Sequence, residues 1–86
     1  MKLMYYSWIS ENLCIDQESM PASLEMSVYD LLSSLKAQSI EKNNAFSKIE
    51  KIYVAINGEL LHKEDFNKKI ITDADTISFF PAVSGG

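Results

Sequence analysis

One amphipathic helix pattern stands near the middle of the sequence, between segments that have the composition of β-strands. Its apolar residues recur at the spacing of one helical face, which predicts a helix that runs to about Ser39. Ser27 is a favourable N-cap, and Asp30 three positions later completes a capping-box pattern. The apolar stripe consists of Val28, Leu31, Leu32 and Leu35. A helix with one apolar face must bury that face against another layer, so the chain is restricted to layered folds.

The segments around this helix predict a sheet. Large aromatic and β-branched residues mark strand patterns on both sides of it. Asn57-Gly58 is a strong hairpin signal, and Pro81 cannot donate to a sheet ladder, so it should end or confine the last strand. The predicted strands are residues 2–9, 23–26, 52–56, 59–62 and 76–80. We expect turns at 10–13 and 72–75, a polar loop at 41–44 and a short helical turn at 45–49.

The predicted order is strand, strand, helix, strand, short strand, strand. One main helix packed on one face of a mixed sheet makes an α+β fold, and the β-grasp arrangement fits this order. We therefore expect one domain over residues 1–80 and an extended C-terminal tail over residues 81–86.

Size and charge exclude several classes of function. The chain has 86 residues and a formal net charge of −4, and a domain this small leaves little room for a deep active-site cleft. An acidic surface repels phosphate backbones, so we expect no nucleic-acid partner but a partner protein with a basic or mixed surface. The sequence shows no signal-peptide pattern and no apolar run of the ~20 residues that cross a bilayer. We expect no membrane partner and a cytoplasmic location.

The usual signals of a catalytic or metal site are missing. Cys14 is the only cysteine and His62 the only histidine, so a metal site built from paired His and Cys ligands lacks its ligands. We interpret Cys14 as a packed or loop residue and His62 as a surface residue. With three glycines the chain has no nucleotide-binding glycine motif. We expect it to bind no cofactor itself.

The last two residues of the sequence, Gly85 and Gly86, indicate a different kind of working group. Glycine has no side chain, so such a tail can thread a narrow channel and present its carboxylate to another protein. Six extended residues reach roughly 20 Å, far enough to enter a partner's pocket. A carboxylate is a poor electrophile and needs activation, for example as an acyl-adenylate. The partner must supply the ATP chemistry, because this chain has no phosphate-binding loop.

Three segments of the sequence resemble those of a known family. Residues 77–86 are similar to the C-terminus of molybdopterin synthase small subunits (MoaD-like sulfur carriers of the ThiS/MoaD family), which end in a hydrophobic strand, Pro-Pro-Val, a small residue and Gly-Gly. Residues 54–57 resemble the family's Val-Ala-Val-Asn strand, and residues 2–6 its opening strand. The tail that carries the likeness consists of Pro81, Ala82, Val83, Ser84, Gly85 and Gly86.

The resemblance implies a ubiquitin-like protein that is not an enzyme on its own. Gly86 would be adenylated by an E1-like, ATP-using enzyme (MoeB-like) and converted to a thiocarboxylate with a sulfur-transferring enzyme. The tail would then insert into the large synthase subunit (MoaE-like) of a heterotetramer. There its sulfur would go to cyclic pyranopterin monophosphate, to build the dithiolene of molybdopterin.

The sequence departs from the family pattern at three places. Ala82 stands where the family usually has a second proline, and Ser10 where an arginine follows the first strand. Ala74 replaces the glycine of an Asp-Gly-Asp turn. If that position needs a positive φ, alanine costs on the order of 1 kcal/mol there.

Side-chain alternation predicts where a partner docks. Ile77 and Phe79 should face the helix, so Phe80 lies on the opposite face of the sheet. Residues of the first strand join it there if the two strands are neighbours, and an exposed aromatic patch marks a partner site. The expected interface consists of Phe80, Tyr6, Trp8 and Met4. Partial cover of this face by loops is the alternative.

Other functions stay open at the level of the sequence. The nearest alternative is a carrier of the same fold that serves thiamine synthesis or tRNA thiolation. A ubiquitin-like modifier joined to lysines through Gly86 is a different class. A plain interaction domain with an accidental Gly-Gly is the simplest alternative.

Overall fold

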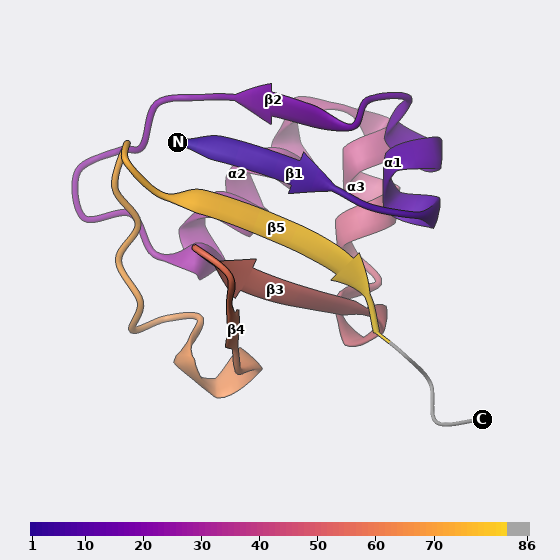
Figure 1. Cartoon of the computed structure of the whole chain (residues 1–86). Helices are drawn as coiled ribbons and strands as arrows, with labels where there is room; N and C mark the ends of the chain where they lie inside the picture. The colour runs from indigo at the N-terminus through magenta and orange to yellow at the C-terminus, as the bar shows by residue number, and fades with distance from the viewer. Residues whose placement is uncertain (83–86) are drawn as a thin grey trace.

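Helix α2 (Val28–Gln38) packs on one face of a five-stranded sheet, as its apolar stripe requires (Figure 1). The computed structural model describes residues 1–82 of the chain. The Ser27 hydroxyl accepts a hydrogen bond from the Asp30 N–H, and the Asp30 carboxylate accepts one from the Ser27 N–H. The predicted capping box is therefore confirmed, and the four stripe residues are buried.

The sheet is mixed, and its strand order is β2-β1-β5-β3-β4. The central pair, β1 and β5, is parallel, whereas the other neighbouring pairs are antiparallel. The strands are β1 (Lys2–Tyr5), β2 (Gln17–Ser19), β3 (Ile52–Ile56), β4 (Glu59–Leu61) and β5 (Thr76–Pro81). The predicted α+β class and β-grasp arrangement are confirmed. The parallel pairing places the first and last strands side by side, although they are far apart in sequence.

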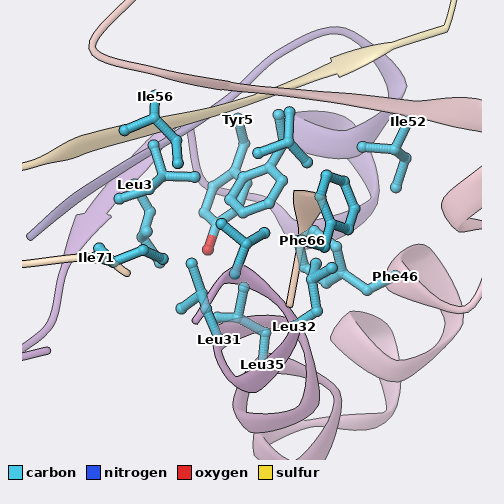
Figure 2. Close-up of a cluster of buried hydrophobic side chains, with 14 of the residues drawn as sticks. Leu3, Tyr5, Leu31, Leu32, Leu35, Phe46, Ile52, Ile56, Phe66 and Ile71 are labelled. Carbon is cyan, nitrogen blue, oxygen red and sulfur yellow. The ribbon is translucent and has the colours of Figure 1, made fainter. Parts of the chain in front are cut away.

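The core lies between this sheet and the helices (Figure 2). Alternate residues of β1, β3 and β5 point toward the helices, including Ile77 and Phe79 of β5, which are fully buried as predicted. The core residues labelled in Figure 2 are Leu3, Tyr5, Leu31, Leu32, Leu35, Phe46, Ile52, Ile56, Phe66 and Ile71. Full burial of a large apolar side chain contributes about 1.5–3 kcal/mol, so these residues hold the two layers together.

The first strand is shorter than predicted. It ends at Tyr5, and helix α1 (Trp8–Leu13) occupies the region where we expected the rest of a strand and a turn. Ser7 has a positive φ of 57°, which turns the chain out of the strand direction. Ile9 and Leu13 lie four residues apart and both pack on the core, so burial of one helical face outweighs the strand-like composition.

The second strand was predicted at the wrong place. Residues 23–26 form a turn, in which the Met26 N–H donates to the Ser23 carbonyl and Glu25 has a φ of 55°. The partner of β1 is instead β2, which is short and polar. Its pairing with β1, rather than its composition, makes this segment a strand.

The polar segment at 41–44 belongs to a helix and is not a loop. Helix α3 (Ile40–Phe46) directly follows α2, and Ser39 caps its first turn by accepting from the Lys42 N–H. The expected helical turn at 45–49 is split between the end of α3 and a 3₁₀ turn, η1 (Ile49–Lys51). Only the last two residues of α3, Ala45 and Phe46, are buried, which explains the weak apolar pattern of this helix.

The hairpin between β3 and β4 has the predicted turn. Asn57 and Gly58 both have positive φ, 52° and 86°, which is the geometry that an Asn-Gly hairpin favours. The Asn57 side chain donates to Asp75 at 2.9 Å and accepts from the Thr76 N–H at 2.9 Å. These bonds tie the hairpin to the start of β5.

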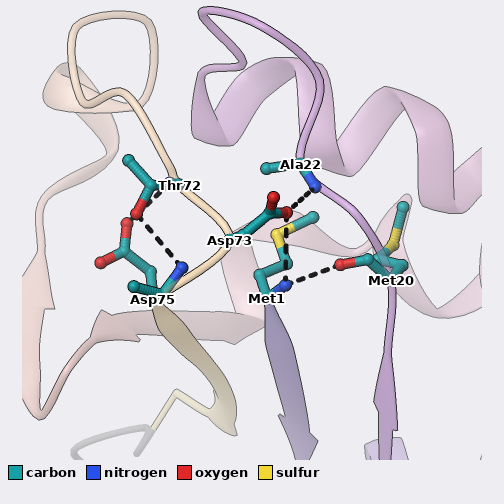
Figure 3. Close-up of polar contacts among 7 residues, drawn as sticks. Met1, Met20, Ala22, Thr72, Asp73 and Asp75 are labelled. Carbon is teal, nitrogen blue, oxygen red and sulfur yellow. Dashed lines mark hydrogen bonds and ion pairs between the residues drawn. The ribbon is translucent and has the colours of Figure 1, made fainter.

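The turn before β5 tolerates alanine without strain. Ala74 does not have a positive φ, so alanine adds no conformational strain at this position. Asp75 accepts a bond from the Thr72 N–H at 2.8 Å (Figure 3). That bond, together with the one from Asn57, lowers the pKa of the Asp75 carboxyl.

A second set of polar contacts fixes the start of β1 (Figure 3). The amino group of Met1 donates to the Met20 carbonyl at 2.7 Å and lies 3.8 Å from the Asp73 carboxylate. Asp73 also accepts from the Ala22 N–H at 2.7 Å. Three segments that are distant in sequence are thereby joined at the same end of the sheet, the end opposite to the C-terminal end of β5.

Candidate functional site

The chain stays attached to the sheet as far as Ala82. The Ala82 N–H donates to the Lys51 carbonyl at 2.7 Å, one residue beyond the pairing of Pro81 with Ile52. Hydrogen-bonded and non-hydrogen-bonded pairs alternate in antiparallel strands, so Pro81 sits at a position where it need not donate to β3. On its other side, β1 has already ended at Tyr5. Proline is therefore accommodated as the last residue of β5.

The predicted working group lies outside the described residues. Val83, Ser84, Gly85 and Gly86 follow the last residue that the structure describes. Pro81 and Ala82, which we expected in the free tail, are instead the last sheet residue and the residue bonded to Lys51. We call the point after Ala82 the tail exit.

An aromatic row crosses the face of the sheet that the helices leave open. Tyr6 and Phe80 stack with ring centroids 4.7 Å apart and an interplanar angle of 10°. Phe80 also pairs in register with Tyr53 on β3. Tyr6 and Tyr53 are exposed, 38% and 41%, and Phe80 is half-buried between them. We define Tyr6, Phe80 and Tyr53 as the aromatic row.

A second row continues this open face. Four residues in register form it, one from each of the strands β1, β5, β3 and β4. In that order they are Met4, Ser78, Ala55 and Leu60. Met4 is half-buried and Leu60 is 54% exposed. Apart from Ser78, the face therefore carries apolar or aromatic side chains from four strands, and it reaches the tail exit through Phe80 and Pro81.

The structure brings together three of the four predicted interface residues. Phe80, Tyr6 and Met4 lie on the open face, and their role in binding stays a prediction. Trp8 does not lie there, because the chain leaves the sheet before it and Trp8 begins helix α1. Its half-buried ring packs against the core, with the Lys48 ammonium 5.8 Å from the ring centroid.

Sequence reasoning missed Tyr53 and Leu60 as members of this face. The signal for Tyr53 was present, because it alternates with the buried Ile52 and Val54 in a strand that was correctly predicted. Its proximity to Phe80 depends on the strand order, which the sequence pattern alone does not determine.

The opposite side of the same strands is closely packed beneath the row. Tyr5 stacks on Phe79 with centroids 5.6 Å apart, and Phe79 meets Phe46 edge-on at 5.0 Å. The Tyr5 hydroxyl donates to Glu18 at 2.6 Å, and Lys42 donates to the same carboxylate oxygen at 2.7 Å. Burial, followed by this bond, raises the pKa of Tyr5. Burial alone would raise the pKa of Glu18, but the bonds from Lys42 and Tyr5 outweigh it and lower that pKa.

Neither Cys14 nor His62 belongs to a catalytic arrangement in the described residues. Cys14 is exposed at the end of α1, near the β2 edge of the sheet. His62 is exposed after β4, at the opposite edge. Within residues 1–82, no three His, Cys, Asp or Glu side chains gather as metal ligands would. In the same range, no helix is long and apolar enough to cross a membrane.

Comparison with known protein families matches the model of the ThiS family to residues 5–86. The chain belongs to the ThiS family. This membership covers nearly the whole chain, and it makes the protein a sulfur carrier or ubiquitin-like protein of the ThiS/MoaD type. Comparison with functionally curated proteins finds no match.

Solved structures share this ThiS-family fold at low identity. The thiamine biosynthesis protein ThiS of Geobacter metallireducens is 24% identical, with a TM-score of 0.61 over 100% of both chains. SAMP1 of Haloferax volcanii is 20% identical, with a TM-score of 0.73 over 100% of this chain and 98% of its own. A Pyrococcus furiosus protein, provisionally described as molybdopterin converting factor subunit 1, is 18% identical, with a TM-score of 0.68 over 95% of each chain. At such identities the likeness establishes the fold.

Proposed function

We propose that the chain is the sulfur-carrying small subunit of molybdopterin synthase. The observation that carries this proposal is the joint placement of the aromatic row and the tail exit. Phe80 belongs to the row, and Ala82, two residues later, is the last described residue. One partner surface can therefore cover the row and receive residues 83–86 in a single docking event. The molybdopterin assignment is supported by the resemblance of residues 80–86 to the small-subunit tail.

The four residues after Ala82 define how close the partner must come. Four extended residues span at most roughly 14 Å. The atom that reacts with the carboxylate of Gly86, taken as the terminal residue, must lie within that distance of Ala82. This reach of the tail is shorter than the one expected from the sequence, because Pro81 belongs to β5 and Ala82 is hydrogen-bonded to Lys51.

The proposed chemistry begins on the terminal carboxylate in the active site of an E1-like partner. One carboxylate oxygen attacks the α-phosphorus of ATP, and pyrophosphate leaves. A hydrosulfide ion, supplied by a sulfur-transferring enzyme, then attacks the acyl carbon and displaces AMP, and loss of its proton leaves a thiocarboxylate. The partner binds the ATP, and the carrier contributes the tail and the docking surface.

In the second proposed stage, the thiocarboxylate enters the large synthase subunit of a heterotetramer. Its sulfur bonds to cyclic pyranopterin monophosphate, and water then hydrolyses the acyl–sulfur bond, which leaves the sulfur on the product and regenerates the carboxylate. Two such transfers supply the two sulfurs of the dithiolene. The rigid sheet beneath the aromatic row gives the tail a fixed starting point, which reduces the entropy lost when it enters the channel.

Reconstitution with the large subunit tests the molybdopterin assignment. We expect the thiocarboxylated chain to convert cyclic pyranopterin monophosphate to molybdopterin. A chain that lacks Gly86 should fold normally, because Gly86 lies beyond the last sheet contact, yet support no conversion. If the thiocarboxylated chain binds the large subunit poorly and yields no molybdopterin, this assignment is wrong.

A second candidate is favoured by the shared fold of two other solved structures, ThiS and SAMP1. The chain would then carry sulfur for thiamine or tRNA thiolation, or would be joined to lysines as a ubiquitin-like modifier. Capture of a thiazole synthase or a tRNA thiolase would support the first of these roles. Higher-mass conjugates that disappear when Gly86 is deleted would support the second.

A further inference from the structure

Two lysines and a tryptophan surround a hollow beside the tail exit. The hollow has a volume of about 310 Å³ and is lined by Trp8, Asn12, Lys48 and Lys51. Lys48 and Lys51 are exposed, and the Lys48 ammonium lies over the Trp8 ring. Trp8, which the sequence placed on the open face of the sheet, therefore belongs to a different surface. We call these four residues the basic hollow.

The basic hollow has a fixed position relative to the tail. Lys51 accepts the last described backbone hydrogen bond, from Ala82, and its own N–H donates to the Lys48 carbonyl at 2.8 Å. The Lys48 N–H in turn donates to the carbonyl of Ala45 at the end of α3. A chain of backbone bonds thus joins the tail exit to both lysines and to the helix layer.

The charges of the hollow are available to a partner. The chain is acidic overall, yet neither lysine forms an ion pair with a carboxylate in residues 1–82, where the ion pairs are Met1 with Asp73 and Lys42 with Glu18. Glu50 lies between the two lysines in sequence without pairing to either, and Glu41 lines an adjoining hollow with Lys48. Each lysine can therefore bind an external carboxylate with little competition from the carboxylates of residues 1–82.

The short reach of the tail brings any activating partner close to this hollow. Its reacting group must lie within roughly 14 Å of Ala82, so the rim of its channel must pass next to Lys51. We propose that the basic hollow receives acidic side chains from the rim of the channel of the adenylating enzyme. This inference rests on the proposed function, and it names the chemistry by which the partner is recognised at the tail. Complementary charges at a rim mainly accelerate and orient association.

Kinetics of the adenylation step test this inference. The assay is ATP–pyrophosphate exchange catalysed by the E1-like enzyme of the same organism, with the full chain as substrate. The test variant is Lys48→Gln with Lys51→Gln, which leaves in place the backbone bond that the Ala82 N–H donates to the carbonyl of residue 51. The control is Lys68→Gln with Lys69→Gln, which removes the same charge near the hairpin end of the sheet.

We expect the Lys48/Lys51 variant to raise the KM for the carrier about tenfold at low salt, with kcat nearly unchanged. The difference should shrink at about 0.5 M salt, because screening weakens exposed charges. The Lys68/Lys69 variant should behave like the unaltered chain. Equal KM values for all three would overturn the inference while the proposed function stands. No exchange with the unaltered chain would overturn the proposed function itself.

Discussion

Glu18 connects the edge of the sheet to the helix layer through one carboxylate oxygen. It receives the Tyr5 hydroxyl from β1 and the Lys42 ammonium from α3. The Lys42 side chain is only 12% exposed and that of Glu18 26%, so the pair is sheltered from solvent more than a typical surface ion pair. A polar residue on a short edge strand thereby stabilises the aromatic packing beneath the open face.

Replacement of Glu18 by glutamine should destabilise the fold in a pH-dependent way. The folded-state pKa of Glu18 is below the ordinary value of 4.5. The charged carboxylate therefore makes its full contribution to the free energy of unfolding above about pH 4.5. It is lost as the pH falls through the lowered folded-state pKa. At pH 7 we expect the unfolding free energy to fall by about 1–2 kcal/mol. Urea unfolding from about pH 7 to about pH 2.5 should show this difference shrink.

Glu50→Gln is the matched control for this experiment. Glu50 is exposed and makes no ion pair within residues 1–82, so the change should stay within about 0.5 kcal/mol at every pH. A Glu18→Gln effect that persists unchanged at low pH would mean that its cause is packing and not charge.

Among the secondary-structure elements, the features marked by strong local sequence signals were predicted correctly. Two elements that depend on tertiary contacts were not. The capping box of α2 and the Asn57-Gly58 turn depend on neighbouring residues, so the pattern alone indicated them. Helix α3 and strand β2 depend on distant contacts. Lys42, which was predicted to lie in a polar loop, pairs with Glu18 and so connects these two elements.

Only part of the candidate site could be predicted from local sequence patterns. The position of Phe80 on the open face followed from strand alternation, and that of Tyr6 followed once β1 and β5 were neighbours. Trp8 was misplaced because the positive φ of Ser7 ends the strand, and nothing in the local composition signals it. The attachment of Ala82 to Lys51 depends on the register between β3 and β5, which periodicity does not determine.

The turn before β5 offers a test at the element scale. Ala74→Gly restores the residue that the resembling family usually has. Because Ala74 does not have a positive φ, glycine relieves no strain and only increases the freedom of the unfolded chain. We expect a loss of about 0.4–1 kcal/mol by thermal unfolding. A gain in stability would show that the turn adopts another conformation in solution.

At the scale of the whole molecule, the two faces of the sheet have different roles. The helices bury one face of the three central strands, and the aromatic row crosses the other face next to the tail exit. The basic hollow lies at the same end, so an acidic carrier presents an apolar surface and a local positive charge around its tail. A partner can thus recognise the fold before it captures the terminal residue.

Tyr53→Ala tests whether the open face binds the partner. We expect the affinity for the large synthase subunit, measured by calorimetry, to fall about tenfold or more, because exposed aromatic residues at the centre of interfaces carry much of the binding energy. Tyr29→Ala is the control, since Tyr29 is also exposed, at 59%, but lies on helix α2. Equal losses for both variants would contradict docking through the sheet.

In the proposed function, Gly86 carries sulfur as a thiocarboxylate. The most direct measurement is the intact mass of the full chain after incubation with its E1-like enzyme, ATP and a sulfur donor. We expect a mass that corresponds to one oxygen replaced by sulfur, located on Gly86 by fragmentation and absent when ATP is withheld. An unchanged mass, with an activating enzyme shown to be functional on another carrier, would contradict it.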